Sequence, residues 1–339
     1  MIILQQAFLH LKSLWTNIGN AFIDYGTIIL WQKVLGEKID DPLSRMSLPP
    51  EFILTTVDRV KMASSFLPCR VLNKIRLLIH DPEAHVLQNY SCFIPEYINN
   101  TEYVSVAGMI LTKRFLMIYK PILEKLKQKG KKLVFIGVGG SKYDRIEVEE
   151  SSKILARLRP YALIAREEKA YKNYSKYFKY SYLGIDNAFF LREKFLKQNN
   201  KKKYIILVFD STKIPKELLK NLLNEEDPEN IVRSFHSFYA SIKPGKVLEE
   251  RSFKIMVSDN PLDYIRLYAS SKKIYSDRVH ACIAGITLGS KCMIYGKMDK
   301  RFLAIERAAV KEEFYAIDGE RYMRERDNEI KFLREIIKI

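Results

Sequence analysis

The sequence KIYSDRVHACIAGITLG, residues 273–289, indicates the fold class of the whole chain. Residues 273–276 form a short β-type run, and residues 279–288 form an apolar run long enough for a helix. This junction is typical of a strand that passes into the helix crossing over a parallel sheet. Small residues at 284, 285 and 289 let such a helix pack closely on its sheet. We therefore predict one strand–helix unit of an α/β protein here.

The same alternation runs along most of the chain. Strands are predicted at residues 103–107, 133–138, 161–165, 182–184, 204–209, 253–257, 273–276 and 291–295. Helices are predicted at residues 113–129, 147–158, 167–177, 216–223, 261–270, 279–288, 301–308 and 320–337. Strands that alternate with helices indicate parallel sheets joined by right-handed crossovers. Residues 40–100 are rich in proline and less periodic, which favours short helices and loops.

A polar stretch, REKFLKQNNKKK at residues 192–203, separates two such series. We therefore predict an α/β fold of two doubly wound Rossmann-like domains, residues 1–192 and 204–339, facing a central cleft. Ligands of open α/β sheets bind outside the carboxyl ends of the strands, so a site in that cleft is expected. By analogy with other proteins of this architecture, the final helix is expected to return across the first domain.

The chain of 339 residues has a strong excess of positive charge. It contains 57 lysines and arginines against 40 acidic residues, a formal net charge of +17. This excess indicates a polyanionic partner: nucleic acid, an anionic lipid surface or a phosphorylated substrate. The densest basic runs, residues 129–132 and 201–203, precede apolar β-type runs, which favours solvated loops. The sequence has no zinc-finger spacing, aromatic RNA-binding motif or helix-turn-helix pattern, so no nucleic-acid partner is expected.

Neither the cysteines nor the apolar segments indicate secretion. The 4 cysteines are widely spaced and form no CxxC pair, so neither a disulfide framework nor a zinc site is predicted. The apolar N-terminus lacks a basic leader and a cleavage site, and residues 18–35 are interrupted by polar residues. We expect a cytoplasmic protein, with peripheral association at the inner face of the membrane left open.

Two glycine-containing turns could hold an anion. Asn17, Gly19 and Asn20 precede an apolar helix, where backbone N–H groups and the helix dipole favour negative charge. The alternative there is a simple helix cap. Gly139 and Gly140 end a strand before the next helix, an arrangement that tolerates phosphate. The alternative there is a tight structural turn.

Charged residues at two strand ends are stronger candidates. Arg166 follows the strand predicted at residues 161–165, and a planar guanidinium suits carboxylate and phosphate oxygens. Arg278 and His280 stand at the strand-to-helix junction described above, where the helix dipole adds to their attraction for an anion. A histidine two positions from an arginine, at a strand end facing a cleft, is a candidate acid or base.

Two further residues have weaker patterns. Asp186 follows the strand predicted at residues 182–184, and we interpret it as a residue that holds a loop or caps the next segment. Arg301 opens a predicted helix next to Lys300. Taken alone, such a basic pair is more often solvated.

The order of these motifs resembles the polysaccharide pyruvyl transferases. NIGNAFID, a GVGG turn, ARE, GIDNAFF and SDRVHACIAGITLG follow one another from residue 17, and a basic residue lies in the next helix. That family has a fold like the two-domain glycosyltransferases called GT-B. Its members move a pyruvyl group from phosphoenolpyruvate onto two hydroxyls of a sugar, making a cyclic ketal. The resemblance implies that Arg166, Arg278, His280 and Arg301 stand at the family's arginine and histidine positions.

The reaction that the resemblance implies accounts for these residue types. Phosphoenolpyruvate carries a carboxylate and a phosphate, which arginines on both walls of a cleft could clamp. His280 could take a hydroxyl proton or protonate the departing phosphate. The implied partners are phosphoenolpyruvate and a glycan acceptor, and the acceptor could be linked to a lipid through phosphate. The implied reaction requires no metal or cofactor. The family commonly has Gly-Asp, with the aspartate as a candidate base, where this chain has Gly19-Asn20. Three alternatives follow: Asp24 substitutes as the base, His280 works alone, or the chemistry differs.

Two alternatives stay open. A GT-B-type glycosyltransferase using a nucleotide-sugar donor would share the architecture and would need an acid for the ribose hydroxyls, for which Glu306 is the nearby candidate. A non-catalytic anion-binding or nucleic-acid-binding protein would also account for the charge of +17.

Overall fold

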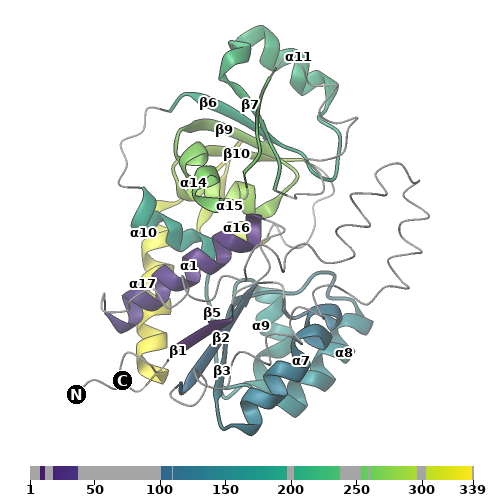
Figure 1. Cartoon of the computed structure of the whole chain (residues 1–339), viewed down its shortest axis with the longest axis vertical. Coiled ribbons are helices and arrows are strands. Elements are labelled where there is room, and N and C mark those ends of the chain that lie inside the picture. Colours follow the sequence, from purple (N-terminus) through teal and green to yellow (C-terminus); the bar gives the residue numbers. More distant parts are fainter. Residues whose placement is uncertain are drawn as a thin grey trace.

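The structure of the chain is a computed structural model. It describes residues 8–11, 18–36, 101–108, 110–196, 202–236, 253–258, 260–295 and 303–337. Within these residues the chain forms two sheets, one in each half of the molecule (Figure 1).

The first sheet has five parallel strands in the order of the chain, β1-β2-β3-β4-β5. The strands are β1 (Phe8–Leu11), β2 (Tyr103–Gly108), β3 (Lys132–Val138), β4 (Ala162–Ala165) and β5 (Tyr180–Leu183). The helices α7 (Lys113–Gln128), α8 (Arg145–Leu158) and α9 (Glu168–Tyr174) share one hydrophobic core with one face of this sheet. The helix α1 (Ile18–Leu35) packs in the core on its other face.

The second sheet has seven strands in the order β11-β12-β10-β9-β6-β7-β8. The strands are β6 (Tyr204–Val208), β7 (Ile231–Ser234), β8 (Lys254–Met256), β9 (Ser271–Ser276), β10 (Lys291–Ile294), β11 (Ala309–Lys311) and β12 (Tyr315–Ile317). Strands β6 to β10 pair in parallel, whereas β12 pairs antiparallel with both of its neighbours, β10 and β11. Its helices are α11 (Lys216–Glu225), α14 (Pro261–Ala269), α15 (Val279–Thr287) and α16 (Leu303–Glu306). The strand order reverses between β6 and β9, which in open α/β sheets is where ligands bind.

Local sequence accounts for where these helices begin and end. In α8, the Asp144 side chain accepts a hydrogen bond from the Glu147 N–H and so caps the first turn. Residues 154, 155 and 158 then recur on one face and are buried. Arg159 ends the helix in a left-handed conformation, with φ 41°.

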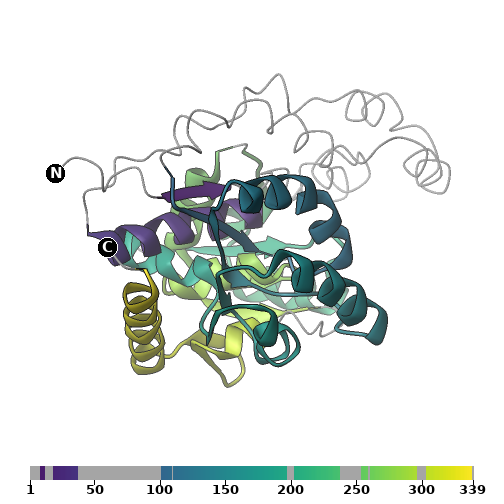
Figure 2. The ribbon, with the colours of Figure 1, turned by 90° about the horizontal axis from the view of Figure 1, so that it is seen from below.

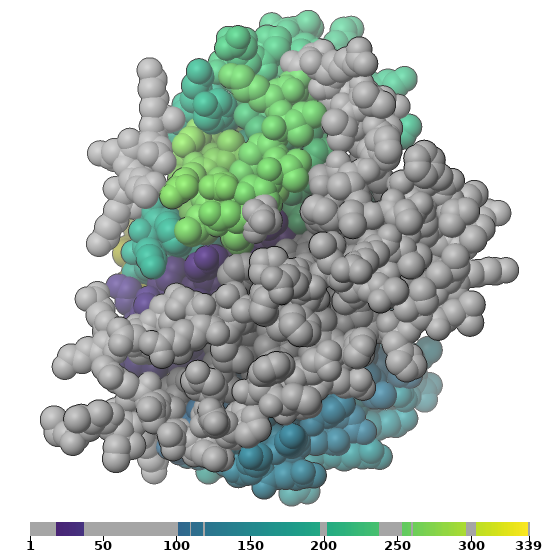
Figure 3. Space-filling model, in the orientation of Figure 1, coloured from purple at the N-terminus to yellow at the C-terminus, as the bar shows by residue number. Residues whose placement is uncertain are grey.

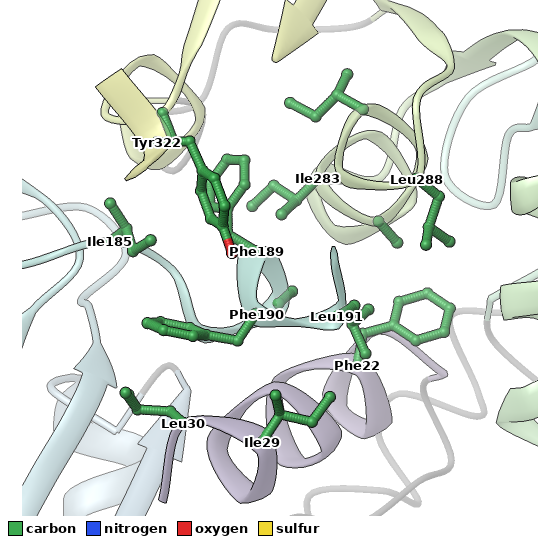
Figure 4. Packing of buried hydrophobic residues seen from close by; sticks show 14 of the residues in the cluster. Phe22, Ile29, Leu30, Ile185, Phe189, Phe190, Leu191, Ile283, Leu288 and Tyr322 are labelled. Atoms are coloured by element: carbon green, nitrogen blue, oxygen red, sulfur yellow. The ribbon is translucent and has the colours of Figure 1, made fainter. Parts of the chain in front are cut away.

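A single hydrophobic cluster joins the two halves of the molecule. It contains Phe22 from α1, Phe189 from the 3₁₀ helix η4 (Asn187–Phe190) and Ile283 from α15 (Figure 4). Helix α1 therefore lies between the two sheets. In Figure 3 part of α1 (purple) is visible at the boundary between the second unit (green) and the first (blue).

Helix α1 and η4 cross with their backbones almost in contact. A Cβ atom on Gly26 would lie 1.8 Å from the backbone oxygen of Asn187. The Asn187 side chain donates to Thr27 Oγ1 at 2.6 Å and to the Ile136 carbonyl at 3.3 Å. Since α1 also packs against α15, this crossing sets how closely the two halves approach.

The C-terminal helix α17 (Gly319–Ile336) packs on the first half of the molecule. Figures 1 and 2 both place α17 (yellow) beside α1 (purple). The Tyr161 hydroxyl donates to the Ile336 carbonyl at 2.6 Å, and Arg334 donates to the backbone carbonyls of Lys33 and Val34. The chain thus ends on the unit in which it began.

The predicted α/β class, with two units built on parallel sheets, is confirmed. Most predicted elements lie within a few residues of the observed ones, while residues 40–100 lie outside the described part of the chain. The strand-order reversal expected of a doubly wound sheet is found in the second sheet, whereas the first keeps the order of the chain. The boundary predicted between residues 192 and 204 stays a prediction.

Strand β7 was not predicted, and the reason is physical. Its residues include Arg233, which breaks the apolar run although the side chain is buried. The Arg233 guanidinium donates to the carbonyls of Leu207 and Phe209 and lies 4.3 Å from the centre of the Phe235 ring. A buried arginine satisfied by backbone carbonyls leaves no apolar pattern for a sequence analysis to detect. The short strands β1, β11 and β12 were not predicted either.

None of the helices in the described residues combines the length and the apolar character that crossing a membrane requires.

Gly26→Ala should destabilise the protein by about 1–3 kcal/mol, because the new methyl group would overlap the backbone of η4 and push α1 away. Urea unfolding of the variant and the wild type measures this difference. Gly319→Ala is the matched control, since a Cβ atom there would meet nothing within 4 Å. Unfolding of both variants at the wild-type urea concentration would contradict the close packing of α1 against η4.

Candidate functional site

The side chains of Arg166, Asp186 and His280 form one cluster, although they come from both halves of the molecule. Arg166 follows β4, Asp186 follows β5, and His280 lies in the first turn of α15. Arg166 Nη1 lies 2.8 Å from Asp186 Oδ2 and 3.3 Å from His280 Nε2. His280 Nε2 lies 3.5 Å from the same Asp186 oxygen. The structure therefore brings Arg166 and His280 together, although 114 residues separate them in the sequence.

The surroundings of each group set its charge. Burial by itself would raise the pKa of Asp186, but Arg166 and the contact with His280 lower that pKa to about 2. Burial lowers the pKa of His280 below its usual value, an effect that Asp186 opposes without cancelling. At neutral pH the cluster thus consists of a carboxylate, a guanidinium and an uncharged imidazole. A neutral imidazole can accept a proton, as a general base must.

Asp186 has a second role in the backbone. Its other oxygen, Oδ1, accepts a hydrogen bond from the Ala188 N–H at 2.9 Å and so caps η4. The interpretation of Asp186 as a cap is correct in that respect. Its pairing with Arg166 and His280 was missed. The only sequence signal for it was an acid directly after a strand, at the sheet edge that also presents Arg166.

Arg278 lies at the point where the strand order of the second sheet reverses. It is the N-cap residue of α15, and its Nε lies 3.5 Å from Asp210 Oδ2, at the end of β6. The Arg278 side chain is 25% exposed, whereas that of Arg166 is 1% exposed. Arg278 is therefore the more accessible of the two arginines.

Asp277 organises the loop beside Arg278. Its carboxylate accepts hydrogen bonds from the backbone N–H groups of Asp210, Ser211 and Thr212, at 3.0, 2.8 and 2.7 Å. Three successive N–H groups that converge on one carboxylate form a pocket suited to an anion. Here that position is taken by a side chain of the protein.

The N-terminal motif lies against the second half of the molecule. The Ile18 N–H, at the start of α1, donates to the His236 carbonyl at 2.9 Å, and the Phe22 and His236 rings lie 5.4 Å apart. Gly19 and Asp24 are buried and Asn20 is partly buried. Helix α1 packs against η4 and α15, the elements that carry Asp186 and His280. Asn17 and Arg301 lie outside the described residues.

The Gly139–Gly140 turn bonds to the protein itself. The Gly139 N–H donates to the Gly108 carbonyl at 3.1 Å, and the Gly140 N–H donates to Glu167 Oε1 at 3.2 Å. The Glu167 carboxylate also contacts the Tyr143 hydroxyl. Sequence reasoning singled out neither Glu167 nor Tyr143, because an acid beside an arginine and a tyrosine in a loop are both commonly solvated.

His236 is a further buried polar residue that the sequence did not indicate. It follows β7 and contacts the Tyr268 hydroxyl through Nε2. Burial lowers the pKa of His236 well below its usual value, so this ring is uncharged. It anchors the start of α1 to the second sheet.

The charged cluster, and not a surface hollow, locates the candidate site. A hollow of about 410 Å³ lies on α17 and includes none of the cluster. It is lined by Asp327, Ile330, Lys331, Arg334 and Glu335. Among the described residues no group of three or more histidine, cysteine or acidic side chains could hold a metal ion.

Glu329 of α17 supports the backbone just ahead of Asp186. Its Oε2 accepts a hydrogen bond from the Ile185 N–H at 3.0 Å, while Oε1 is buried and finds no hydrogen-bond partner within the described ranges. Gly184 makes room, since a Cβ atom there would lie 2.2 Å from Oε2. Burial raises the pKa of Glu329 to about 8, so its carboxyl group is protonated at neutral pH.

Comparison with known families and structures gives the following matches. Residues 30–295 match the model of a protein family described as polysaccharide pyruvyl transferase. A comparison with curated proteins found no match. Similar solved structures include the UDP-GlcNAc 2-epimerase of Methanocaldococcus jannaschii in complex with UDP-GlcNAc and UDP, at 14% identity and a TM-score of 0.45, covering 76% of this chain and 74% of that one. The UDP-GlcNAc 2-epimerase of Neisseria meningitidis bound to UDP-GlcNAc matches at 13% identity and a TM-score of 0.45, covering 76% and 74%. At these values neither likeness carries information on substrate.

The wild-type protein should become less stable as the pH rises and Glu329 ionises, and Glu329→Gln should remove this pH dependence. Because the folded pKa is raised, the contribution of Glu329 is complete below pH 4.5 and is lost as the pH rises toward 8. Over that window the free energy of unfolding of the wild type should fall, relative to the variant, by about 1.4 kcal/mol per pH unit at most. Urea unfolding of both proteins at several pH values measures the difference. Glu335→Gln, at an exposed position of the same helix, is the control and should show no such trend.

Proposed function

Because the chain belongs to the polysaccharide pyruvyl transferase family, we propose that it transfers a pyruvyl group from phosphoenolpyruvate to a sugar of a cell-surface glycan or of its precursor. The observation that carries this proposal is the contact between Arg166 and His280 across the two halves of the molecule. It supports a site assembled from the ends of β4, β5 and β9, at the edges of both sheets.

The donor molecule suits the charges of the site. Phosphoenolpyruvate carries a carboxylate and a phosphate, and guanidinium groups bind both with paired hydrogen bonds. Arg278 is accessible enough to take one of these anionic groups. Arg166 is buried against Asp186, so in our proposal it orients His280 and adds positive charge beside the donor.

His280 is the proposed proton carrier. Its Nε2 faces Arg166 and Asp186. In our proposal Nε2 carries the ring proton and directs it at Asp186, so Nδ1 is unprotonated and is left for the substrates. An uncharged imidazole there can take the proton of an attacking sugar hydroxyl and return it to the departing phosphate. Asp186 would hold the ring in place and stabilise the imidazolium that forms, as carboxylates beside catalytic histidines do.

The net charge supports an anionic acceptor. A formal charge of +17 attracts an acidic glycan precursor, such as one borne on a lipid phosphate, and would favour work at a negatively charged membrane surface.

A nucleotide sugar is the competing donor, because the strand order of the second sheet suits a nucleotide. The loop after β6 is where a diphosphate would be expected, yet its N–H groups bond to Asp277. A diphosphate would have to displace that carboxylate, and we therefore favour phosphoenolpyruvate.

The protein should release phosphate from phosphoenolpyruvate when a suitable glycan acceptor is present. His280→Ala should lower that rate by at least about 100-fold, since positioned acid–base groups contribute 10²–10⁴-fold. A phosphate-release assay over a panel of glycan acceptors measures both. A His280→Ala variant with the wild-type rate would remove this residue from the mechanism.

Phosphoenolpyruvate should raise the melting temperature of the protein, and UDP or a UDP-sugar should not. Arg278→Ala should abolish that rise, because it removes the accessible guanidinium. Arg266→Ala, which removes an arginine that is 70% exposed in the same half of the molecule, is the matched control. Stabilisation by the nucleotide alone would favour the glycosyltransferase alternative instead.

A further inference from the structure

The proposed reaction needs more proton transfers than one histidine can easily provide. Carbon 3 of the enolpyruvyl group must gain a proton, and each attacking sugar hydroxyl must lose one. Asn20, in the first turn of α1, neither donates nor accepts a proton near neutral pH. A second acid–base group would share these transfers with His280, and this inference rests on the proposed function.

Glu167, the residue directly after Arg166, is a buried acid. It is 1% exposed, and its buried Oε2 has no hydrogen-bond partner among the residues that the structure describes. Burial raises the pKa of Glu167, an effect that Arg166 and Tyr143 oppose without cancelling. A carboxyl group in such a place keeps its proton at a higher pH than an exposed one.

Tyr143 connects this buried acid to the surface. Its hydroxyl contacts Glu167 Oε1 and also accepts a hydrogen bond from the Gly140 N–H. Glu167 is buried, whereas Tyr143 is only partly buried. Within the described residues, the phenol is thus the group through which a proton of Glu167 could reach a bound molecule.

The loop that carries Tyr143 is held in a strained conformation. Tyr143 has φ 54°, in the left-handed region that residues other than glycine rarely adopt. The Glu147 carboxylate holds it there by accepting hydrogen bonds from the N–H groups of Ser141, Lys142 and Tyr143. Such strain persists only where the surroundings impose it, and it gathers at functional sites.

Arg166 lies between this pair and His280. Its Nη1 is 3.3 Å from His280 Nε2, while its Nε is buried and has no hydrogen-bond partner in the described part of the chain. A Cβ atom on Gly139 would lie 2.7 Å from that Nε and 2.4 Å from Glu167 Oε1, so both atoms flank the same glycine. One guanidinium group therefore adjoins both acid–base pairs.

We propose that Glu167 and Tyr143 form the acid that protonates carbon 3 of the enolpyruvyl group. The Tyr143 O–H gives its proton to carbon 3 as the C2=C3 double bond supplies the electron pair for the new C–H bond. In the same step the Glu167 carboxyl group passes its proton to the Tyr143 oxygen, so no phenolate forms. Carbon 2 becomes electrophilic and accepts the oxygen of the first sugar hydroxyl, whose proton goes to His280. His280 returns that proton to the phosphate as the bond between carbon 2 and the phosphate oxygen breaks. The second sugar hydroxyl then adds to carbon 2 and loses its proton to the neutral imidazole, which closes the ketal. Glu167 is left as a carboxylate and regains a proton from solvent.

The charged groups around the pair are compatible with this step. Glu167 faces Arg166 and, more distantly, Asp186, while Tyr143 lies beside Glu147 at the start of α8. Asp186 favours a protonated Glu167, and Arg166 opposes it. Once the proton has left, Arg166 stabilises the resulting carboxylate.

Tyr143→Phe and Glu167→Gln test the proposal in the full-length protein. Each should lower phosphate release from phosphoenolpyruvate and glycan acceptor by about 100-fold or more. The wild-type rate should fall as the pH rises, because the acid must be protonated, and both variants should lose that alkaline decline. Both should keep the rise in melting temperature that phosphoenolpyruvate causes, since neither removes an arginine.

Glu168→Gln and Tyr177→Phe are the matched controls. Glu168 is exposed and paired with Lys172, and Tyr177 lies in the 3₁₀ helix η3 (Ser175–Tyr177), so both should react at the wild-type rate with the wild-type pH profile. Variants at 143 and 167 with wild-type rates and profiles would overturn this inference while leaving the proposed function intact. A wild-type protein that releases no phosphate with any acceptor would overturn the proposed function and this inference with it.

Discussion

The buried carboxylate of Asp186 is the group on which the candidate site depends. It is fully buried, and it is ionised because Arg166 and His280 lie within 3.5 Å of one oxygen. Its other oxygen caps η4. An uncompensated buried charge is costly, so the carboxylate and the guanidinium each require the other. Because His280 comes from the second half of the molecule, this pairing also holds the two halves in register at the site.

The packing around Asp186 explains why its position is well defined. Asn187, the next residue, is held by Thr27 of α1 and by the Ile136 carbonyl, in a space that Gly26 leaves open. On the other side, Glu329 of the C-terminal helix holds the Ile185 N–H. Three segments that are distant in the sequence thus fix one loop of a few residues. The chemistry of the site is built on that loop, and a small shift of the loop would move Arg166 and His280 apart.

The charges of the site form two pairs, both next to the guanidinium of Arg166. Asp186 and His280 contact its Nη1, and Glu167, which Tyr143 contacts, lies with its Nε beside Gly139. Burial shifts two of the pKa values in opposite directions, because it lowers that of His280 and raises that of Glu167. The imidazole is therefore suited to accept a proton and the carboxyl group to supply one. A reaction that both adds and removes protons at one small molecule needs groups of both kinds.

The order of strands and helices from residue 103 onward, and the placing of Arg166, Arg278 and His280 at strand ends, could be read from local patterns alone. Periodicity is a property of neighbouring residues, and a residue just after a strand must lie at one edge of the sheet. The pairing of Asp186 with His280, the burial of Glu167 under Tyr143 and the strand β7 around the buried Arg233 could not be read in this way. Each depends on groups far apart in the sequence, or on a polar residue whose burial is made tolerable by backbone carbonyls. Folding brings these groups together and removes them from water, and only then do their charges and pKa values take the form that the chemistry requires.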